Sequence, residues 1–189
     1  YRIPATVAQR VPGCRVPARR LKARDMATSK VSQIARALDL PDLGATAALA
    51  RVIAAAAQAG DVIALWGDLG AGKTTFARAF IAARSGEAEE VPSPTFTLVQ
   101  VYEQGAVPVW HFDLYRVESH EEVYELGFEE ALGTAIALIE WPERLGPLLP
   151  AVRLDVRLSF AADPEARRAE LVSWGDWAAR LEALDVHAG

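Results

Sequence analysis

The 189-residue sequence predicts an α/β fold, in which helices cover both faces of a mainly parallel β-sheet. Short apolar runs of strand length alternate along the chain with longer segments of helical periodicity, as in proteins built from β-α-β units. Toward the C-terminus, residues 152–160 alternate strictly between apolar and polar side chains, which indicates an antiparallel strand with one face in water. We therefore expect a three-layer sandwich with antiparallel edge strands near the C-terminus.

A helix over residues 46–59 is the first expected element. Its apolar side chains recur at the i, i+3, i+4 and i+7 positions, which favours one buried stripe. Asp42 or Thr46 can cap its start, and Gly60 is placed to end it. A short apolar run over residues 61–66 then predicts a buried strand.

A second helix is expected over residues 74–84, where apolar side chains again share one face. The later elements rest on shorter signals, which are apolar runs of strand length, a capping-box pattern at residues 119–122, and Pro142 at the first position of a helical turn. In chain order, the later elements are strands over 95–102 and 107–112, a short helix after 119, a strand over 135–139, a helical turn from 142, strands over 152–160 and 170–174, and a helix over 177–184. We place the strand over 152–160 at an edge of the sheet.

Charge is unevenly distributed along the chain. Residues 1–25 hold seven basic side chains and one acidic one, a net charge of +6, although the whole chain carries −5. Residues 26–189 therefore carry −11. A targeting peptide would be rich in serine, whereas residues 1–25 have no serine and three prolines, and the only methionine is Met26. We expect residues 1–25 to be a basic leader, either translated upstream of the true start or disordered, and residues 26–189 to form one domain.

Composition excludes several classes of protein. Hydrophobic residues make up 51% of the chain and charged residues 24%, as in ordinary globular proteins. The longest apolar stretch is broken by polar side chains and falls short of the roughly 20 residues that span a bilayer. The single cysteine, Cys14, excludes an internal disulfide and favours a reducing compartment, so we expect a cytoplasmic protein.

The most informative motif runs from Gly67 to Thr74, Gly-Asp-Leu-Gly-Ala-Gly-Lys-Thr, and matches the phosphate-binding pattern GxxxxGK[ST]. Glycines let backbone N–H groups approach phosphate oxygens, and the helix that follows directs its positive end at the same anion. Lys73 would reach the β- and γ-phosphates, and the Thr74 hydroxyl would bind Mg²⁺. The motif predicts a P-loop NTPase-like sandwich. The residues expected to bind the nucleotide are Asp68, Leu69, Gly70, Ala71, Gly72, Lys73, Thr74 and Thr75.

Two acidic residues follow apolar runs. Glu140 follows residues 135–139, at the position where P-loop proteins hold an acid for Mg²⁺, and Asp113 follows residues 107–112. Because ligands gather at the carboxyl ends of the strands in open α/β sheets, both acids are candidates for the site. The alternative for each is a solvated acid at the end of a strand. We assign catalytic roles to Lys73, Glu140 and Asp113, and assign Mg²⁺ to Thr74 and Glu140.

Weaker candidates have competing interpretations. The segment Ser-Pro-Thr-Phe-Thr at 93–97 is either a switch loop or a proline turn. His111 is a core or surface histidine more readily than a metal ligand. Trp141 either covers the site or packs beside it. Arg116 is either a cation for the transition state or a partner in a salt bridge.

Four motifs together resemble the TsaE family. They are GDLGAGKTTF at 67–76, SPTFTLV at 93–99, HFDLYR at 111–116 and IEWP at 139–142, in the family's order and spacing. The resemblance covers the chain from about Pro41 to the last helix. It implies a small P-loop ATPase, required for threonylcarbamoyladenosine formation on tRNA, that acts on the TsaB–TsaD pair and uses ATP and Mg²⁺.

Matched motif by motif, the resemblance implies that Lys73 and the glycines bind the phosphates and that Thr74 and Glu140 bind Mg²⁺. It makes Asp113 part of a switch and Trp141 the family's tryptophan beside the site. We therefore count Trp141 among the residues expected to bind the nucleotide. It places the adenine contact around residues 41–46 without assigning a residue. Contact with tRNA is expected to run through partner proteins, since a body with a charge of −11 is a poor match for phosphate backbones. We expect no role at membranes or DNA.

Two other functions are compatible with the motifs. One is a nucleotide-sensing module in which hydrolysis is incidental. The other is a small-molecule kinase, which would need arginines on a lid, and residues 85–150 contain only Arg116 and Arg144.

Overall fold

The structure is a computed structural model and describes residues 34–86, 97–119 and 122–184. All of these residues belong to one compact unit, residues 31–189. The leader expected at residues 1–25 lies outside the described residues, as does most of the segment expected to be a switch loop, 93–96.

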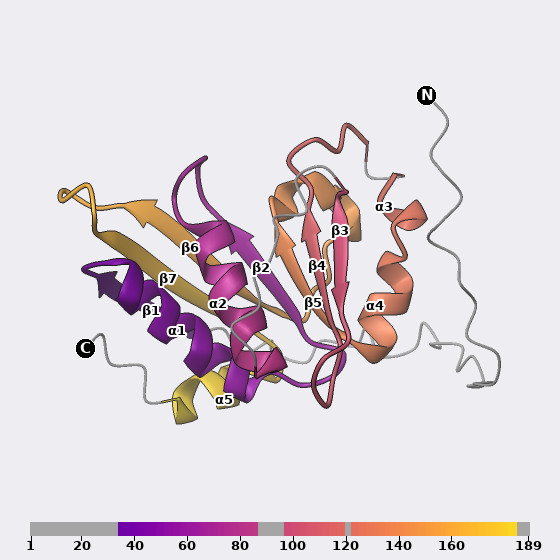
Figure 1. Cartoon of the computed structure of the whole chain (residues 1–189), viewed down its shortest axis with the longest axis horizontal. Coiled ribbons are helices and arrows are strands. Elements are labelled where there is room, and N and C mark those ends of the chain that lie inside the picture. The colour runs from indigo at the N-terminus through magenta and orange to yellow at the C-terminus, as the bar shows by residue number, and fades with distance from the viewer. Residues whose placement is uncertain (1–33, 87–96, 120–121, 185–189) are drawn as a thin grey trace. The chain divides into compact units, whose positions relative to one another are not determined.

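A seven-stranded sheet forms the middle layer (Figure 1), with the strand order β1-β7-β6-β2-β5-β4-β3. Strands β2, β4, β5 and β6 are mutually parallel, whereas β1, β3 and β7 pair in antiparallel fashion. The strand bounds are β1 Ile34–Leu40, β2 Val62–Trp66, β3 Val99–Tyr102, β4 Val109–Asp113, β5 Ile136–Glu140, β6 Arg153–Phe160 and β7 Arg167–Trp174. The α/β sandwich with a parallel core and antiparallel strands is therefore confirmed.

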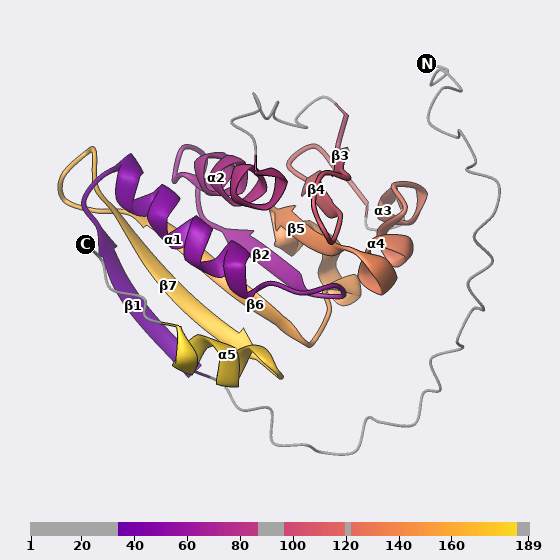
Figure 2. The same cartoon turned by 60° about the horizontal axis from the view of Figure 1, so that its bottom comes forward.

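Helices cover the two faces of this sheet unequally. On one face lie α1 (Leu43–Ala56), α2 (Lys73–Ser85) and α5 (Trp177–Ala183), and they share a buried core with β2, β5, β6 and β7. Figure 2 shows α1 and α2 side by side on this face. On the other face, a second core includes α3 (Glu122–Glu125), α4 (Phe128–Thr134) and the 3-10 segment η1 (Pro142–Leu148). None of the helices in the described part of the chain is long and apolar enough to cross a membrane.

Local sequence signals fix several of these boundaries. The Asp42 carboxylate accepts the Ala45 N–H at 2.8 Å and caps α1, so the capping residue is Asp42 rather than Thr46. The glutamate of the expected capping box, Glu122, accepts the Ser119 N–H at 3.0 Å. Pro142 begins η1, where its missing N–H costs nothing.

The expected edge position of β6 is wrong. β6 lies inside the sheet, parallel to β2 on one side and antiparallel to β7 on the other. The edges are β1, which the sequence pattern did not indicate, and β3. The strict alternation in β6 arises because its Leu154, Val156 and Leu158 side chains pack into the core shared with the helices, whereas the polar side chains between them point to the opposite face of the strand. Alternation of apolar and polar residues indicates which face of a strand is packed in the core. It does not identify the strands with which that strand pairs.

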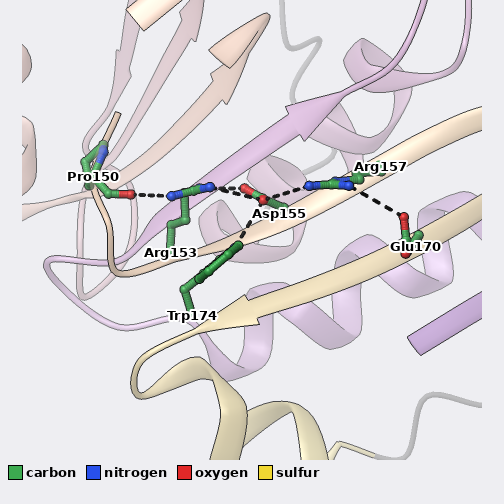
Figure 3. Close-up of polar contacts among 6 residues, drawn as sticks. All are labelled: Pro150, Arg153, Asp155, Arg157, Glu170 and Trp174. Atoms are coloured by element: carbon green, nitrogen blue, oxygen red, sulfur yellow. Dashed lines mark hydrogen bonds and ion pairs between the residues drawn. The ribbon is translucent and has the colours of Figure 1, made fainter. Parts of the chain in front are cut away.

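A buried carboxylate lies at the centre of a polar network on the opposite face of β6 and β7 (Figure 3). Asp155 is fully buried and accepts two hydrogen bonds from Arg153, at 2.7 and 3.3 Å. The indole N–H of Trp174 donates to the same carboxylate at 3.2 Å, and Arg157 lies 3.6 Å away. Arg157 also reaches the exposed Glu170 at 3.8 Å. Asp155 is therefore the acceptor that holds three large side chains flat on the sheet.

We expect Asp155→Ala to lower the free energy of unfolding by about 2–4 kcal/mol. The substitution removes a buried carboxylate that accepts hydrogen bonds from cationic side chains, and it leaves those side chains without their acceptor. Chemical denaturation followed by circular dichroism measures the change. Glu170→Ala is the matched control and should change the unfolding free energy by less than about 0.5 kcal/mol, since its ion pair is exposed. Equal losses in the two variants would show that the buried network does not stabilise this face.

Candidate functional site

The loop from Gly67 to Thr74 joins the carboxyl end of β2 to the start of α2 and has the backbone that the motif requires. Gly67 has φ 135° and Gly72 has φ 105°, a region that other residues rarely adopt. A Cβ atom on Gly67 would lie 2.2 Å from the carbonyl oxygen of Leu158 on β6, so no larger residue fits there. The loop thus depends on glycine both for its turn and for its close approach to the neighbouring strand.

Lys73 is the first residue of α2, and its side chain folds back over the loop. Its ammonium group donates to the carbonyl oxygens of Gly67 at 2.7 Å and Asp68 at 2.8 Å. Only 4% of the residue is exposed. Burial lowers the pKa of Lys73 below its usual range, and the nearby carboxylates, Glu140 above all, oppose that shift. The loop therefore holds a buried cation. The two carbonyl oxygens that accept its hydrogen bonds can be replaced by the oxygen atoms of an anion.

The two predicted acids lie side by side. β4 and β5 are parallel neighbours, and Asp113 is opposite Glu140 in their register. Both side chains are almost fully buried. Side-chain alternation explains their common direction, because Val109 on β4 and Leu138 on β5 share their parity and pack into the core beneath α2. The strand-end position inferred from sequence therefore brings both carboxylates to the phosphate loop.

Glu140 is held from two sides. The Thr74 hydroxyl donates to its Oε2 atom at 2.9 Å. The Nε2 atom of His111 lies 2.9 Å from its Oε1 atom, and because a carboxylate only accepts, the ring proton belongs on Nε2. His111 is fully buried, and its Nδ1 atom has no hydrogen-bond partner among the described residues. The imidazole therefore fixes the orientation of the carboxylate.

Trp141 covers the lysine. Its indole ring centroid lies 3.7 Å from the Lys73 ammonium nitrogen, and the centroid of the Tyr115 ring lies 4.9 Å from that of the indole. The Trp141 backbone has φ 60°, the left-handed region that a bulky residue seldom adopts. Such strain is typical of functional positions. The covering role is thus favoured over simple packing beside the site.

One cavity of about 270 Å³ collects these groups. Its lining comprises Leu69, Gly70, Gly72, Lys73, Thr74, Thr75, Asp113, Tyr115, Arg116, Glu140 and Trp141. Two predicted residues, Asp68 and Ala71, are absent from the lining. Ala71 is fully buried with its side chain in the core, and Asp68 meets Lys73 through its backbone carbonyl. Any contact that Ala71 makes with a ligand must therefore come from its backbone.

Sequence reasoning missed His111 and Tyr115 as parts of the site. The signal for His111 was present, because residues two apart on a strand share a face, and His111 is two residues before Asp113. Its partner Glu140 lies on another strand, however, so the pair appears only once β4 and β5 are in register. Arg116, for which a role at the transition state was left open, does line the cavity.

The oxygen atoms of Thr74 and Glu140 are suitable ligands for Mg²⁺ when a polyphosphate is bound at the same site. Mg²⁺ prefers oxygen ligands and commonly takes one or two protein groups, with phosphate and water completing an octahedron. The Thr74 hydroxyl and the Glu140 carboxylate lie 2.9 Å apart, at the start of α2, where a phosphate oxygen can join them. The described residues contain no cluster of three His, Cys, Asp or Glu side chains that would hold a metal without such a ligand.

A glycine-rich loop between a strand and a helix, a buried lysine and two strand-end acids define a nucleotide-binding P-loop protein. The family model described as "Threonylcarbamoyl adenosine biosynthesis protein TsaE" matches residues 40–169. The chain belongs to the TsaE family.

Curated relatives agree with this assignment. A tRNA threonylcarbamoyladenosine biosynthesis protein TsaE from Rickettsia conorii is 43% identical over 128 residues, which are 68% of this chain and 73% of the relative. The protein of that name from Bacillus subtilis is 43% identical over 121 residues, 64% of this chain and 75% of the relative. The crystal structure of B. subtilis YdiB has the same fold, with a TM-score of 0.61 and 30% identity over 82% of this chain and 95% of YdiB.

Proposed function

We propose that this chain binds ATP with Mg²⁺ and hydrolyses it in the cytoplasm, as the ATPase component of the machinery that forms threonylcarbamoyladenosine on tRNA. The role in threonylcarbamoyladenosine biosynthesis comes with membership of the TsaE family. The observation that carries the rest is the position of Glu140, which a buried histidine and the hydroxyl of the phosphate loop hold at the cavity. An acid fixed in this way is suited to a reaction rather than to solvation at a strand end.

Each residue of the site has a task in this reaction. The loop N–H groups and the start of α2 would bind the phosphates, and the Lys73 ammonium would exchange its two carbonyl partners for β- and γ-phosphate oxygens. Thr74 and Glu140 would hold Mg²⁺, which supplies neutralisation of the phosphate charge when bound. Asp113, which lines the cavity beside Glu140, would orient the attacking water. Trp141 and Tyr115 would exclude bulk water from the reacting phosphate.

Partner proteins complete the proposal. The resemblance to TsaE implies that the chain acts on a TsaB–TsaD pair and meets tRNA only through it. The experiment immobilises the chain and measures retention of TsaB–TsaD with ATP, a non-hydrolysable ATP analogue, ADP or no nucleotide. We expect retention with ATP and the analogue and release in ADP. Equal retention in all four conditions, or none in any, would refute a nucleotide-controlled interaction.

His111 is proposed as a positioning residue for Glu140. His111→Phe is expected to lower the turnover of ATP by about 10- to 100-fold, because the carboxylate loses the hydrogen bond that orients it. ATP affinity should change by less than about 3-fold, since His111 does not line the cavity. Steady-state ATPase assays and calorimetric titration with ATP measure the two quantities.

Phe112→Leu is the control for this prediction, because it perturbs the same strand from its opposite face, in the second core. It should leave turnover within about 2-fold of the unmodified chain, while thermal unfolding reports any loss of stability in either variant. Unchanged turnover in His111→Phe, or an equal loss in both variants, would contradict the positioning role.

A further inference from the structure

A cavity separate from the nucleotide site lies among the side chains of β1, β6 and β7. Its volume is about 380 Å³, and its lining comprises Ala37, Arg157, Leu158, Ser159, Arg168 and Glu170. None of these residues lines the nucleotide cavity described above. Arg157 and Ser159 alternate along β6 with the side chains that pack into the core shared with α1 and α2, so they point away from those helices. We call it the β6–β7 cavity.

Arg157 brings unused hydrogen-bond donors to the β6–β7 cavity. Its guanidinium lies between Asp155 and Glu170 (Figure 3), at 3.6 and 3.8 Å, and both distances are too long for a hydrogen bond. Arg153, on the same face of β6, instead donates to Asp155 at 2.7 and 3.3 Å, and its side chain is 15% exposed against 48% for Arg157. The buried Asp155 is therefore satisfied by Arg153, and the N–H groups of Arg157 can bind a ligand.

Arg168 and Ser159 add further donors to the same cavity. The two residues are opposite each other in the register of β6 and β7, two positions along the strands from Arg157 and Glu170. Among the described residues, neither side chain has a hydrogen bond or an ion pair, even though Asp39 lies opposite Arg168 in the register of β1 and β7. An arginine has five N–H donors and a serine hydroxyl has one. The β6–β7 cavity therefore holds two guanidinium groups and a hydroxyl without a hydrogen-bond acceptor in the described part of the chain.

The charge of the lining indicates the class of ligand. Two arginines and one glutamate give the lining a net charge of +1, which one carboxylate would neutralise. A nucleic acid or a polyphosphate would instead place several negative charges beside Glu170, on residues 26–189, which carry −11. A guanidinium also matches a carboxylate in shape, because it donates two parallel hydrogen bonds to the two oxygens. Ala35 and Ala37, exposed on the edge strand β1, favour a protein segment over a free ion, since they add apolar surface that a protein would cover.

We propose that the β6–β7 cavity is the docking site for an acidic side chain, an aspartate or a glutamate, of the partner protein. The inference rests on the proposed function, in which the chain acts on a protein complex. The carboxylate of the partner would accept hydrogen bonds from Arg157 and Arg168, and Ser159 would donate its hydroxyl to the same group. Arginine is enriched in protein interfaces and is among the residues that contribute most to binding.

The β6–β7 cavity includes the strand that lies next to the phosphate loop. Arg157 is opposite Trp66 in the register of β2 and β6, and Trp66 precedes Gly67, the first residue of the loop. The carbonyl oxygen of Leu158 is the group that a Cβ atom on Gly67 would meet at 2.2 Å. A partner bound at the cavity would therefore hold the strand against which the loop packs, as an interaction controlled by the nucleotide requires.

Biolayer interferometry with the full chain immobilised tests the proposal, with Mg-ATP present and TsaB–TsaD as the probe. We expect Arg157→Gln and Arg168→Gln each to weaken the affinity for TsaB–TsaD by about 10-fold or more, because each removes one cation from the partner's carboxylate. Glu170→Gln should instead strengthen this affinity by about 2- to 5-fold, since it removes the acid that repels that carboxylate. Arg51→Gln, which makes the same change in charge at an exposed position of α1, is the control and should stay within about 2-fold.

The results separate the docking site from the proposed function. If the unmodified chain does not bind TsaB–TsaD, the proposed function fails and the docking site fails with it. If the unmodified chain binds and both arginine variants bind equally well, only the docking site is refuted. Weaker binding in Glu170→Gln as well as in the arginine variants would indicate a disturbed strand pair and would contradict a carboxylate ligand.

Two further measurements address an indirect effect and the other occupants. Calorimetric titration with Mg-ATP should give each variant an affinity within about 2-fold of the unmodified chain, because the two cavities share no lining residue. A loss of ATP affinity as large as the loss of TsaB–TsaD affinity would overturn the proposal. Binding of free tRNA, or self-association of the chain, that Arg157→Gln abolishes would assign the cavity to phosphate groups or to a second copy and would also overturn it.

Discussion

Replacing Lys73 by alanine is expected to weaken ATP binding by at least about 100-fold, the largest effect that a single change in this site should have. The Lys73 ammonium is almost completely buried, and its two hydrogen bonds go to carbonyl groups of the loop that surrounds the phosphates. No other basic residue except Arg116 lines the cavity in the described part of the chain. Without Lys73, the phosphate groups of a nucleotide in the cavity would therefore lack their nearest buried cation.

Calorimetric titration of Mg-ATP measures this loss, and Arg51→Ala is the matched control. Arg51 is an exposed residue of α1, so its removal makes the same change in net charge outside the cavity. ATP affinity in Arg51→Ala should stay within about 2-fold of the unmodified chain, since exposed charges are screened. An ATP affinity that Lys73→Ala does not alter would refute the assignment of the phosphate loop.

The second large effect concerns Glu140. Glu140→Gln is expected to lower ATP turnover by at least about 100-fold while ATP affinity changes by less than about 3-fold. Glutamine keeps the shape of the side chain and one oxygen that can accept from Thr74 or His111, but it lacks the negative charge that would hold Mg²⁺. The loss should therefore fall on the reaction rather than on the binding of the phosphates to the loop and Lys73.

Glu129→Gln makes the same chemical change at an exposed position of α4 that does not line the cavity. It should retain turnover within about 2-fold. Steady-state ATPase assays and calorimetric titration give the two readouts for both variants. Full turnover in Glu140→Gln would show that this carboxylate does not serve the reaction.

Local patterns were sufficient to predict most elements and the phosphate loop. The loop is a contiguous run of residues whose glycines are required by local geometry, as the 2.2 Å approach of a Gly67 Cβ to Leu158 shows. The helix starts at Asp42 and Pro142 likewise depend on neighbouring residues alone. Features of this kind are readable from sequence because the physical cause and the signal occupy the same short segment.

Features that depend on pairing between distant strands were not predictable in this way. The position of β6 inside the sheet depends on its partners β2 and β7, which alternation within β6 does not identify. The contact of His111 with Glu140 joins residues 29 positions apart and needs the register of β4 with β5. These parts of the site come from the fold rather than from any motif.

The central claim is that ATP hydrolysis at Glu140 supports threonylcarbamoyladenosine formation on tRNA. The most direct measurement is the threonylcarbamoyladenosine content of tRNA, by mass spectrometry, in cells whose only copy of this protein is Glu140→Gln. We predict that the content falls to the level of cells that lack the protein, while Glu129→Gln sustains the ordinary level. An ordinary content in Glu140→Gln cells, with the purified variant inactive as an ATPase, would contradict the claim and favour a nucleotide-sensing module.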